Sequence, residues 1–250
     1  MRRRIVCALS LLALLCLSGC VTLETDLLYN KIDAAHSAVY SYELQTEYHW
    51  TFTAPAWTFQ RDGTANQKVI DHADYQLISH AQTTDNGVPY TFTSYIKDDC
   101  VYFDDRGAKY KRKTTDDELA LLKEDILAAH RLDAFSSVRV ESLPDGGKQL
   151  TFVLEPRVVG PEADSFLKSS LAFMDFAIAE TALQSFQYTL TIDDAYLVRE
   201  EDFRAEALLT LSDGTPVQVQ YALTQECSAY NTFDRLAFPD NLDTYPDLFA

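Results

Sequence analysis

The stretch YSYELQTEYHWTF, residues 40–52, decides the fold. Its aromatic residues, together with Leu44 and Thr46, alternate with polar residues, so an extended chain turns one face to a core and the other to water. This period of two predicts one long strand. Pro55 ends it, because proline has no N–H to donate to a sheet ladder.

Further strands follow on the C-terminal side, separated by turn signals such as Asp85-Asn86-Gly87 and Asp98-Asp99. Because strands that are neighbours in sequence tend to pair, they are expected to form an antiparallel meander. The strands expected in the first half cover 57–70, 75–82, 89–97, 100–103 and 109–113. Those expected in the second half cover 138–143, 149–155, 186–192, 196–211 and 215–224.

Three segments repeat apolar residues at helical spacing, and these helices are expected over 24–39, 115–129 and 161–183. The last has an unusually broad apolar surface. It must therefore be covered on more than one side, as when a helix lies across the hollow of a curved sheet. The sequence predicts an α+β fold: a strongly curved antiparallel half-barrel sheet with helices packed on the concave face.

The composition favours one folded body. Hydrophobic residues make up 47% of the chain and aromatic residues 12%, which excludes disorder and predicts a core rich in Tyr and Phe. No segment between Cys20 and Ala250 has the composition of a linker. We therefore expect a single domain over residues 20–250, with two smaller domains as the alternative.

The N-terminus carries the features of a secretion signal. Arg2, Arg3 and Arg4 precede an apolar run over 5–17, which is too short to span a membrane as a helix. Leu17-Ser18-Gly19-Cys20 resembles the lipobox of bacterial lipoproteins. That resemblance implies a signal peptide over residues 1–19 and a diacylglyceryl group on Cys20, and so a lipid anchor on the extracytoplasmic face of the cell membrane. The alternative is an ordinary signal in which the cysteine is incidental.

The charge of the chain excludes nucleic acid as a partner. The signal holds three of the 21 basic residues and none of the 38 acidic ones, so 18 basic residues face 38 acidic ones in the mature chain, a formal charge of −20. Such a charge repels nucleic acid and anionic head groups alike. Attachment to the membrane is therefore expected to come from the acyl chains.

One basic cluster stands out, at Lys109, Lys111, Arg112 and Lys113. Lysines at alternating positions are typical of an edge strand protected against aggregation. A patch that contacts membrane or anions is the alternative. The two cysteines outside the signal and the anchor, Cys100 and Cys227, could form a disulfide in an extracytoplasmic protein, or each could be a small buried residue.

No motif indicates enzymatic chemistry. The chain has no Gly-x-Ser-x-Gly elbow, no Cys-x-x-Cys pair and no glycine-rich phosphate loop. Asp71-His72 with Asp74 is the nearest approach to a metal cluster, but it lacks a second histidine at ligand spacing and is typical of a turn. We expect no catalytic residue, no metal site and no cofactor.

Three short motifs are similar to the lipoprotein carriers LolA, LolB and the mycobacterial LppX group, and closest to uncharacterised lipoproteins of Gram-positive bacteria. They are Tyr95-Ile96-Lys97-Asp98-Asp99 with Tyr102, the stretch Gly107-Ala108-Lys109-Tyr110-Lys111, and Tyr230-Asn231 with Pro239. The resemblance implies an incomplete barrel whose concave side is covered by helices and holds acyl chains.

An apolar hollow between the first strand and the last helix is the candidate ligand site. The lining residues expected for it are Tyr42, Leu44, Tyr48, Trp50, Phe52, Phe166, Leu167, Phe173 and Met174. The predicted function is noncatalytic binding of a hydrophobic or amphipathic, lipid-like ligand. The alternative is that these residues pack on one another as a closed core, and that the protein is an envelope module that contacts other proteins.

Overall fold

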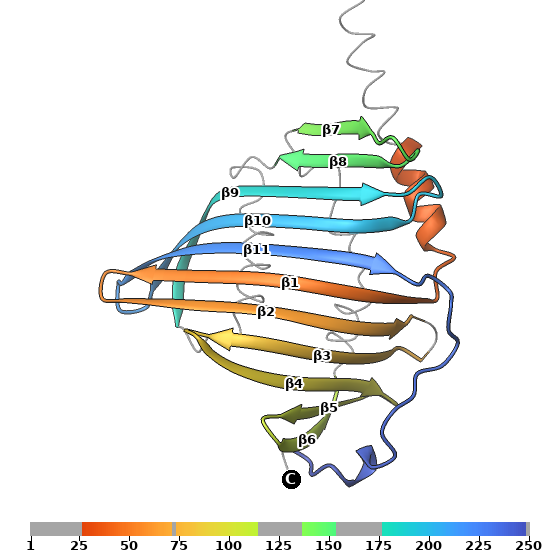
Figure 1. The fold of residues 1–250 in the computed structure, drawn as a ribbon. Coiled ribbons are helices and arrows are strands. Elements are labelled where there is room, and N and C mark those ends of the chain that lie inside the picture. The colour runs from red at the N-terminus through yellow and green to blue at the C-terminus, as the bar shows by residue number, and fades with distance from the viewer. Residues whose placement is uncertain (1–26, 72–73, 115–136, 154–176, 249–250) are drawn as a thin grey trace, which may run out of the picture.

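The computed structural model describes residues 27–71, 74–114, 137–153 and 177–248. Its strands form one eleven-stranded sheet in the order β6-β5-β4-β3-β2-β1-β11-β10-β9-β8-β7 (Figure 1). The first six strands are β1 (Ser41–Ala54), β2 (Trp57–Ile70), β3 (Gln76–Asp85), β4 (Val88–Lys97), β5 (Cys100–Asp105) and β6 (Ala108–Lys113). The other five are β7 (Ser137–Ser142), β8 (Lys148–Val153), β9 (Ile178–Ile192), β10 (Val198–Leu211) and β11 (Pro216–Ser228).

The sheet consists of two meanders that meet at one pair of strands. Strands β1 to β6 pair in sequence order, and so do β7 to β11, always antiparallel. The central seam, defined as the pairing of β1 with β11, runs from Glu43 opposite Ser228 to Thr53 opposite Gln218. Strands β6 and β7 are the two ends, so the sheet is open and the predicted curved antiparallel α+β fold is confirmed.

The alternation predicted over 40–52 is present in β1 and extends to its neighbours. Phe52 lies opposite Phe59 and Val219, which defines an apolar face of the sheet. Thr51 lies between Gln60 and Gln220 on the other side, the polar face. The register of the sheet follows from this pattern, because a slip of one residue would exchange the two faces.

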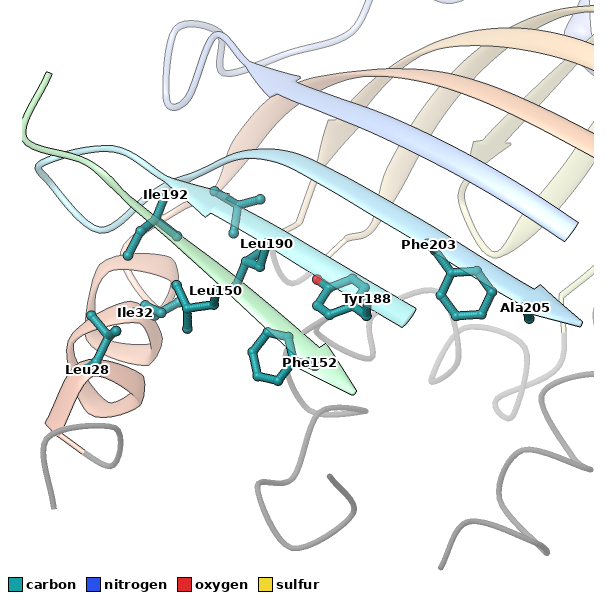
Figure 2. Close-up of a cluster of buried hydrophobic side chains, with 10 residues drawn as sticks. Leu28, Ile32, Leu150, Phe152, Tyr188, Leu190, Ile192, Phe203 and Ala205 are labelled. Atoms are coloured by element: carbon teal, nitrogen blue, oxygen red, sulfur yellow. The ribbon is translucent and has the colours of Figure 1, made fainter. Parts of the chain in front are cut away.

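A helix over 27–36 covers one corner of the apolar face. Figure 2 shows Leu28 and Ile32 of this helix facing Leu150 and Ile192 on β8 and β9. Ile32 is fully buried in that cluster. Their spacing of four residues places both side chains on one stripe of the helix, as the sequence predicted.

The expected helix over 161–183 is wrong at its C-terminal end, because β9 already begins at Ile178. Ala182 and Leu183 favour helices, but they pair here with Leu208 and Ala207 of β10. Tertiary pairing therefore overrides local propensity, as it often does in strands. The rest of this helix, the one expected over 115–129 and residues 24–26 lie outside the described residues.

The predicted turn at Asp85-Asn86-Gly87 joins β3 to β4. Asn86 and Gly87 both have positive φ, 47° and 83°, as a type I′ hairpin turn requires. The Asn86 side chain also accepts a hydrogen bond from the backbone N–H of Gln60 at 2.8 Å. The turn is thereby tied to β2.

The C-terminal strap, residues 229–248, crosses from the end of β11 to β6 (Figure 1). Asn231 fixes its start: the side-chain oxygen accepts from the backbone N–H of Tyr40 at 2.8 Å, and the amide donates to the carbonyl of Ala38. Farther on, Leu242 and Tyr245 are buried against Tyr95 and Tyr102. The strap thus covers the few apolar side chains of the polar face at this end of the sheet.

The strap also pairs with the edge of β6. The N–H of Lys111 donates to the carbonyl of Pro246 and the N–H of Leu248 donates to the carbonyl of Lys111, both at 2.9 Å. The prediction that the lysine cluster lies on an edge strand is confirmed. Besides its charges, this edge is protected by main-chain pairing.

Candidate functional site

The five candidate residues on the first strand all lie on β1, and they divide into two groups. Trp50 and Phe52 are core residues: the Trp50 ring stacks on Tyr221 with centroids 3.8 Å apart, and Phe52 is fully buried beside Phe59. Tyr42 and Leu44 lie on the same face outside this packed cluster, whereas Tyr48 packs against its margin. The expected partners Phe166, Leu167, Phe173 and Met174 lie outside the described residues.

Beside these residues, β2, β3 and β4 carry a run of small side chains on the apolar face. We call it the small-residue stripe: Gly63, Ala65, Ser79, Ala81 and Ser94. Ala65 pairs with Ala81, and both are buried, although neither side chain can fill much space. The stripe separates the aromatic cluster of β1 from the apolar cluster of Val69, Tyr75 and Leu77.

Tyr48 closes one end of the stripe. Its ring lies over Gly63, where an added Cβ would be only 2.3 Å from the ring atoms. Its hydroxyl is 2.7 Å from Oγ1 of Thr83, so the ring is held by its contact with Gly63 and by the hydrogen bond to Thr83. Glycine is required at this position because no side chain fits beneath the tyrosine.

Next to Tyr48, Arg61 and Asp85 form a bidentate ion pair on the apolar face. Nε and Nη2 of Arg61 donate to the two carboxylate oxygens of Asp85 at 2.6 and 2.7 Å. These hydrogen bonds lower the pKa of the Asp85 carboxyl. The guanidinium of Arg106 lies 4.1 Å from the ring centroid of Tyr90 beside it. The stripe therefore ends in a charged, hydrogen-bonded rim.

The substitution Arg61→Gln is expected to lower the free energy of unfolding at pH 7 by about 1–3 kcal/mol, because a half-buried carboxylate loses its bidentate partner. Since the folded-state pKa of Asp85 is depressed, this contribution is present above the unfolded-state pKa of about 4 and disappears as pH falls through the lower folded value. Urea unfolding at pH 7 and pH 3 tests the difference. Lys68→Gln, which breaks the exposed pair with Glu43, should change stability by less than about 1 kcal/mol.

Besides the Arg61–Asp85 pair, the apolar face has a second group of polar side chains, at the end covered by the helix over 27–36. Glu201 and Tyr188 are both almost completely buried there, and burial followed by the charge of Glu201 raises the pKa of the Tyr188 hydroxyl. Burial likewise raises the pKa of the Cys227 thiol to about 12. The thiol is therefore neutral and unreactive at neutral pH.

The disulfide left open by the sequence does not form, because Cys100 and Cys227 are both free. Cys100 is on β5 and Cys227 on β11, with four strands between them, a path of about 24 Å along the sheet. A disulfide needs the two Cα atoms within about 7 Å. Cys227 instead packs against the apolar cluster of Figure 2, the alternative that the sequence offered.

Two hollows lie on the polar face. An open trough of about 750 Å³ follows β1, β2 and β3, and it is lined by Glu47, His49, Asp62, Gln82 and several threonines. A second hollow of about 490 Å³ lies between β1 to β3 and the strap, which covers it at 233–237. Sequence patterns gave no sign of either, since both are products of sheet twist and of the path of the strap.

Within the described residues, no group of three or more His, Cys, Asp or Glu side chains could hold a metal ion. In that same part of the chain, we find no helix with the length and apolar character needed to cross a membrane. The predicted lipidation residue Cys20 and the signal peptide over 1–19 are outside it.

The open eleven-stranded sheet with one apolar face places the protein in the class of α+β half-barrels. No family model matches the chain, and no functionally curated protein is similar to it. Among solved structures it is similar to LprF from Mycobacterium bovis, with 12% identity, a TM-score of 0.49, and coverage of 86% of this chain and 97% of LprF.

Two further structures are similar at lower scores. A DUF1329 family protein from Desulfovibrio piger has 9% identity and a TM-score of 0.25, covering 86% of this chain and 95% of its own. A domain from Vibrio parahaemolyticus described as an outer membrane lipoprotein-sorting protein has 8% identity and a TM-score of 0.23, covering 81% and 89%.

Proposed function

We propose that the protein is an extracytoplasmic lipoprotein, anchored through Cys20, whose apolar face binds a hydrophobic or amphipathic, lipid-like ligand without transforming it. The small-residue stripe carries this proposal. On the described sheet, bulky side chains pack against each other on both sides of the stripe, whereas the stripe itself carries the small side chains of Ala65, Ala81 and Ser79, all of them buried. An acyl chain lying along the stripe would take the space that larger side chains fill elsewhere on this face, with the Arg61–Asp85 rim for a polar head.

The ligand site is tested by filling the stripe. Ala81→Leu should weaken binding of a fluorescent fatty acid at least tenfold, because the added side chain takes the place of part of the ligand. Ala222→Leu is the matched control, since Ala222 lies on the polar face, lining the trough, and the same change there should leave binding as it is. Native mass spectrometry should show lipid co-purifying with the wild-type chain and with the control.

Thermal melting of both variants separates lost binding from lost folding, because overpacking of a buried position can destabilise by about 1–3 kcal/mol. If Ala81→Leu keeps its melting temperature and binds the fatty acid like the wild type, the stripe is not the ligand site. A wild-type chain free of lipid would contradict ligand binding altogether.

The anchor is tested separately. Six residues lie between Cys20 and residue 27, so the two are at most about 25 Å apart and lipidation would hold the sheet close to the bilayer. Cys20→Ala should abolish labelling with radioactive palmitate and release the protein from the membrane fraction, while ligand binding stays intact. Labelling that persists in this variant would contradict the anchor.

The alternative, an envelope module that contacts proteins through the lysine edge, has less support. The N–H and carbonyl of Lys111 are already paired with the strap, so a partner could not add a strand there. Lys109 is also paired with Asp104 at 3.3 Å. A partner would have only the side chains of this edge to recognise.

A further inference from the structure

Three polar side chains on the polar face form a hydrogen-bonded chain that the ligand site does not use. His49 and Thr51 are two residues apart on β1, and Asp62 lies directly opposite His49 on β2. Oγ1 of Thr51 is 2.9 Å from Nε2 of His49, and Nδ1 of His49 is hydrogen-bonded to Oδ1 of Asp62. The adjacency of β1 and β2 is visible in Figure 1.

The three hydrogen-bonded side chains follow the order hydroxyl, imidazole, carboxylate, which is the order that activates a hydroxyl. Asp62 as a carboxylate can only accept, so the shared hydrogen of His49 sits on Nδ1. Nε2 then has a lone pair, and the Thr51 hydroxyl donates to it. A hydroxyl, an imidazole and a carboxylate linked in this sense make up the hydroxyl–His–acid arrangement of acyl-transfer enzymes, which is recognised by geometry and not by sequence order.

The surroundings supply a place for substrate. His49 and Asp62 line the 750 Å³ trough, whose other side chains include Thr64, Gln82 and Thr224, and Thr51 lies next to His49 just outside this lining. Thr51 itself is only partly exposed, whereas its neighbour Thr53 is exposed.

Donors for a developing oxyanion also lie nearby. The backbone N–H groups of a central strand are used in the hydrogen bonds of the sheet, so the donors to an oxyanion must be side chains. Gln60 and Gln220 are the cross-strand neighbours of Thr51 on its two sides, at the Cβ separation of about 5 Å typical of such pairs. Of their amides, Nε2 of Gln220 donates to Glu206 at 3.3 Å.

We propose that Thr51, His49 and Asp62 form a hydrolytic site for short-chain esters of polyhydroxylated alcohols. The lining decides the substrate class. Hydroxyl, amide and carboxylate groups suit an alcohol part with many hydroxyls, whereas Glu47 and Asp62 repel anionic substrates. An open polar trough gives no burial to a long acyl chain. The site lies on the face opposite the proposed ligand site and does not depend on it.

The reaction has two balanced steps. Oγ1 of Thr51 attacks the ester carbonyl while Nε2 of His49 takes the hydroxyl proton, and the tetrahedral intermediate collapses by breaking the bond to the alcohol, which leaves with that proton. Water then attacks the acyl group on Thr51, giving its proton to His49. The carboxylic acid leaves and Thr51 regains its hydrogen, so the sum is ester plus water to acid plus alcohol.

The test is hydrolysis of p-nitrophenyl acetate and of acetylated xylose by the full chain in detergent. Thr51→Val keeps the branched shape without the hydroxyl and should lower kcat/KM at least tenfold, as should His49→Gln. Thr53→Val is the matched control on the same face and strand, and it should match the wild type. Thr51→Ser should retain activity. A fluorophosphonate probe should label the wild type and the control but not Thr51→Val.

Surface imidazoles hydrolyse activated esters without a nucleophilic hydroxyl, so the variant that removes the Thr51 hydroxyl is the decisive one. If Thr51→Val, folded by circular dichroism, hydrolyses both esters at the wild-type rate, the proposal is overturned. It is overturned equally if the wild type leaves acetylated xylose intact and takes no fluorophosphonate label. In that case the three residues only pair β1 with β2, which a fall in melting temperature of Asp62→Asn would report.

Discussion

Replacing Phe52 by alanine is expected to lower the free energy of unfolding by about 3–5 kcal/mol, the largest effect of a single truncation that we anticipate. Phe52 is fully buried at the central seam, beside Phe59, with its ring 5.7 Å from that of Trp50. Alanine would leave a cavity between strands from both meanders. The backbone cannot collapse into it, because β1 is paired on both sides.

Urea unfolding followed by tryptophan fluorescence measures this loss, since Trp50 reports on the same cluster. Val88→Ala is the control: Val88 is 66% exposed at the start of β4, and its truncation should change stability by less than about 0.5 kcal/mol. A loss below about 1 kcal/mol for Phe52→Ala would mean that the aromatic cluster is loosely packed. The interpretation of Trp50 and Phe52 as core residues would then be wrong.

Gly63→Ala is expected to be the second most damaging change, lowering the free energy of unfolding by about 2–3 kcal/mol. The new methyl group would lie 2.3 Å from the Tyr48 ring, so the ring must move away and its hydroxyl must leave Thr83. Ordinary strands gain stability when alanine replaces glycine. We therefore attribute the reversed sign to Tyr48, which supplies the three heavy atoms nearest to the new Cβ.

A double-mutant cycle tests that dependence. In a Tyr48→Ala background the methyl group of Gly63→Ala meets no ring, and the second substitution should be neutral or slightly stabilising. The coupling energy between the two positions should reach about 2 kcal/mol. Additive losses would show that Gly63 is needed for a reason other than the tyrosine above it.

Most of the sheet could be predicted from the sequence, because its information is local. The alternation over 40–52 and the turn at Asn86-Gly87 are properties of neighbouring residues, and both are present in the structure. The strand over 178–183 could not be predicted, since Ala182 and Leu183 follow helix preferences until β10 pairs with them. The order of the strands, with β11 beside β1, depends on contacts between residues far apart in sequence.

The candidate sites show the same limit. The sequence placed Tyr42, Leu44 and Tyr48 on an apolar face, but only the register reveals that Ala65 and Ala81 lie side by side to form the stripe. In the sequence, His49 and Asp62 are 13 positions apart and no motif joins them. Pairing of β1 with β2 brings them into contact.

The central seam has a consequence for the kinetics of folding. Among the eleven described strands, every other pair joins neighbours along the chain, whereas Leu44 and Cys227 of the seam are 183 positions apart. Closing so long a loop is slow, so each meander can assemble early and their zipping together should limit the rate. Substitutions at the seam should then slow refolding, and those in the outer hairpins should mainly hasten unfolding.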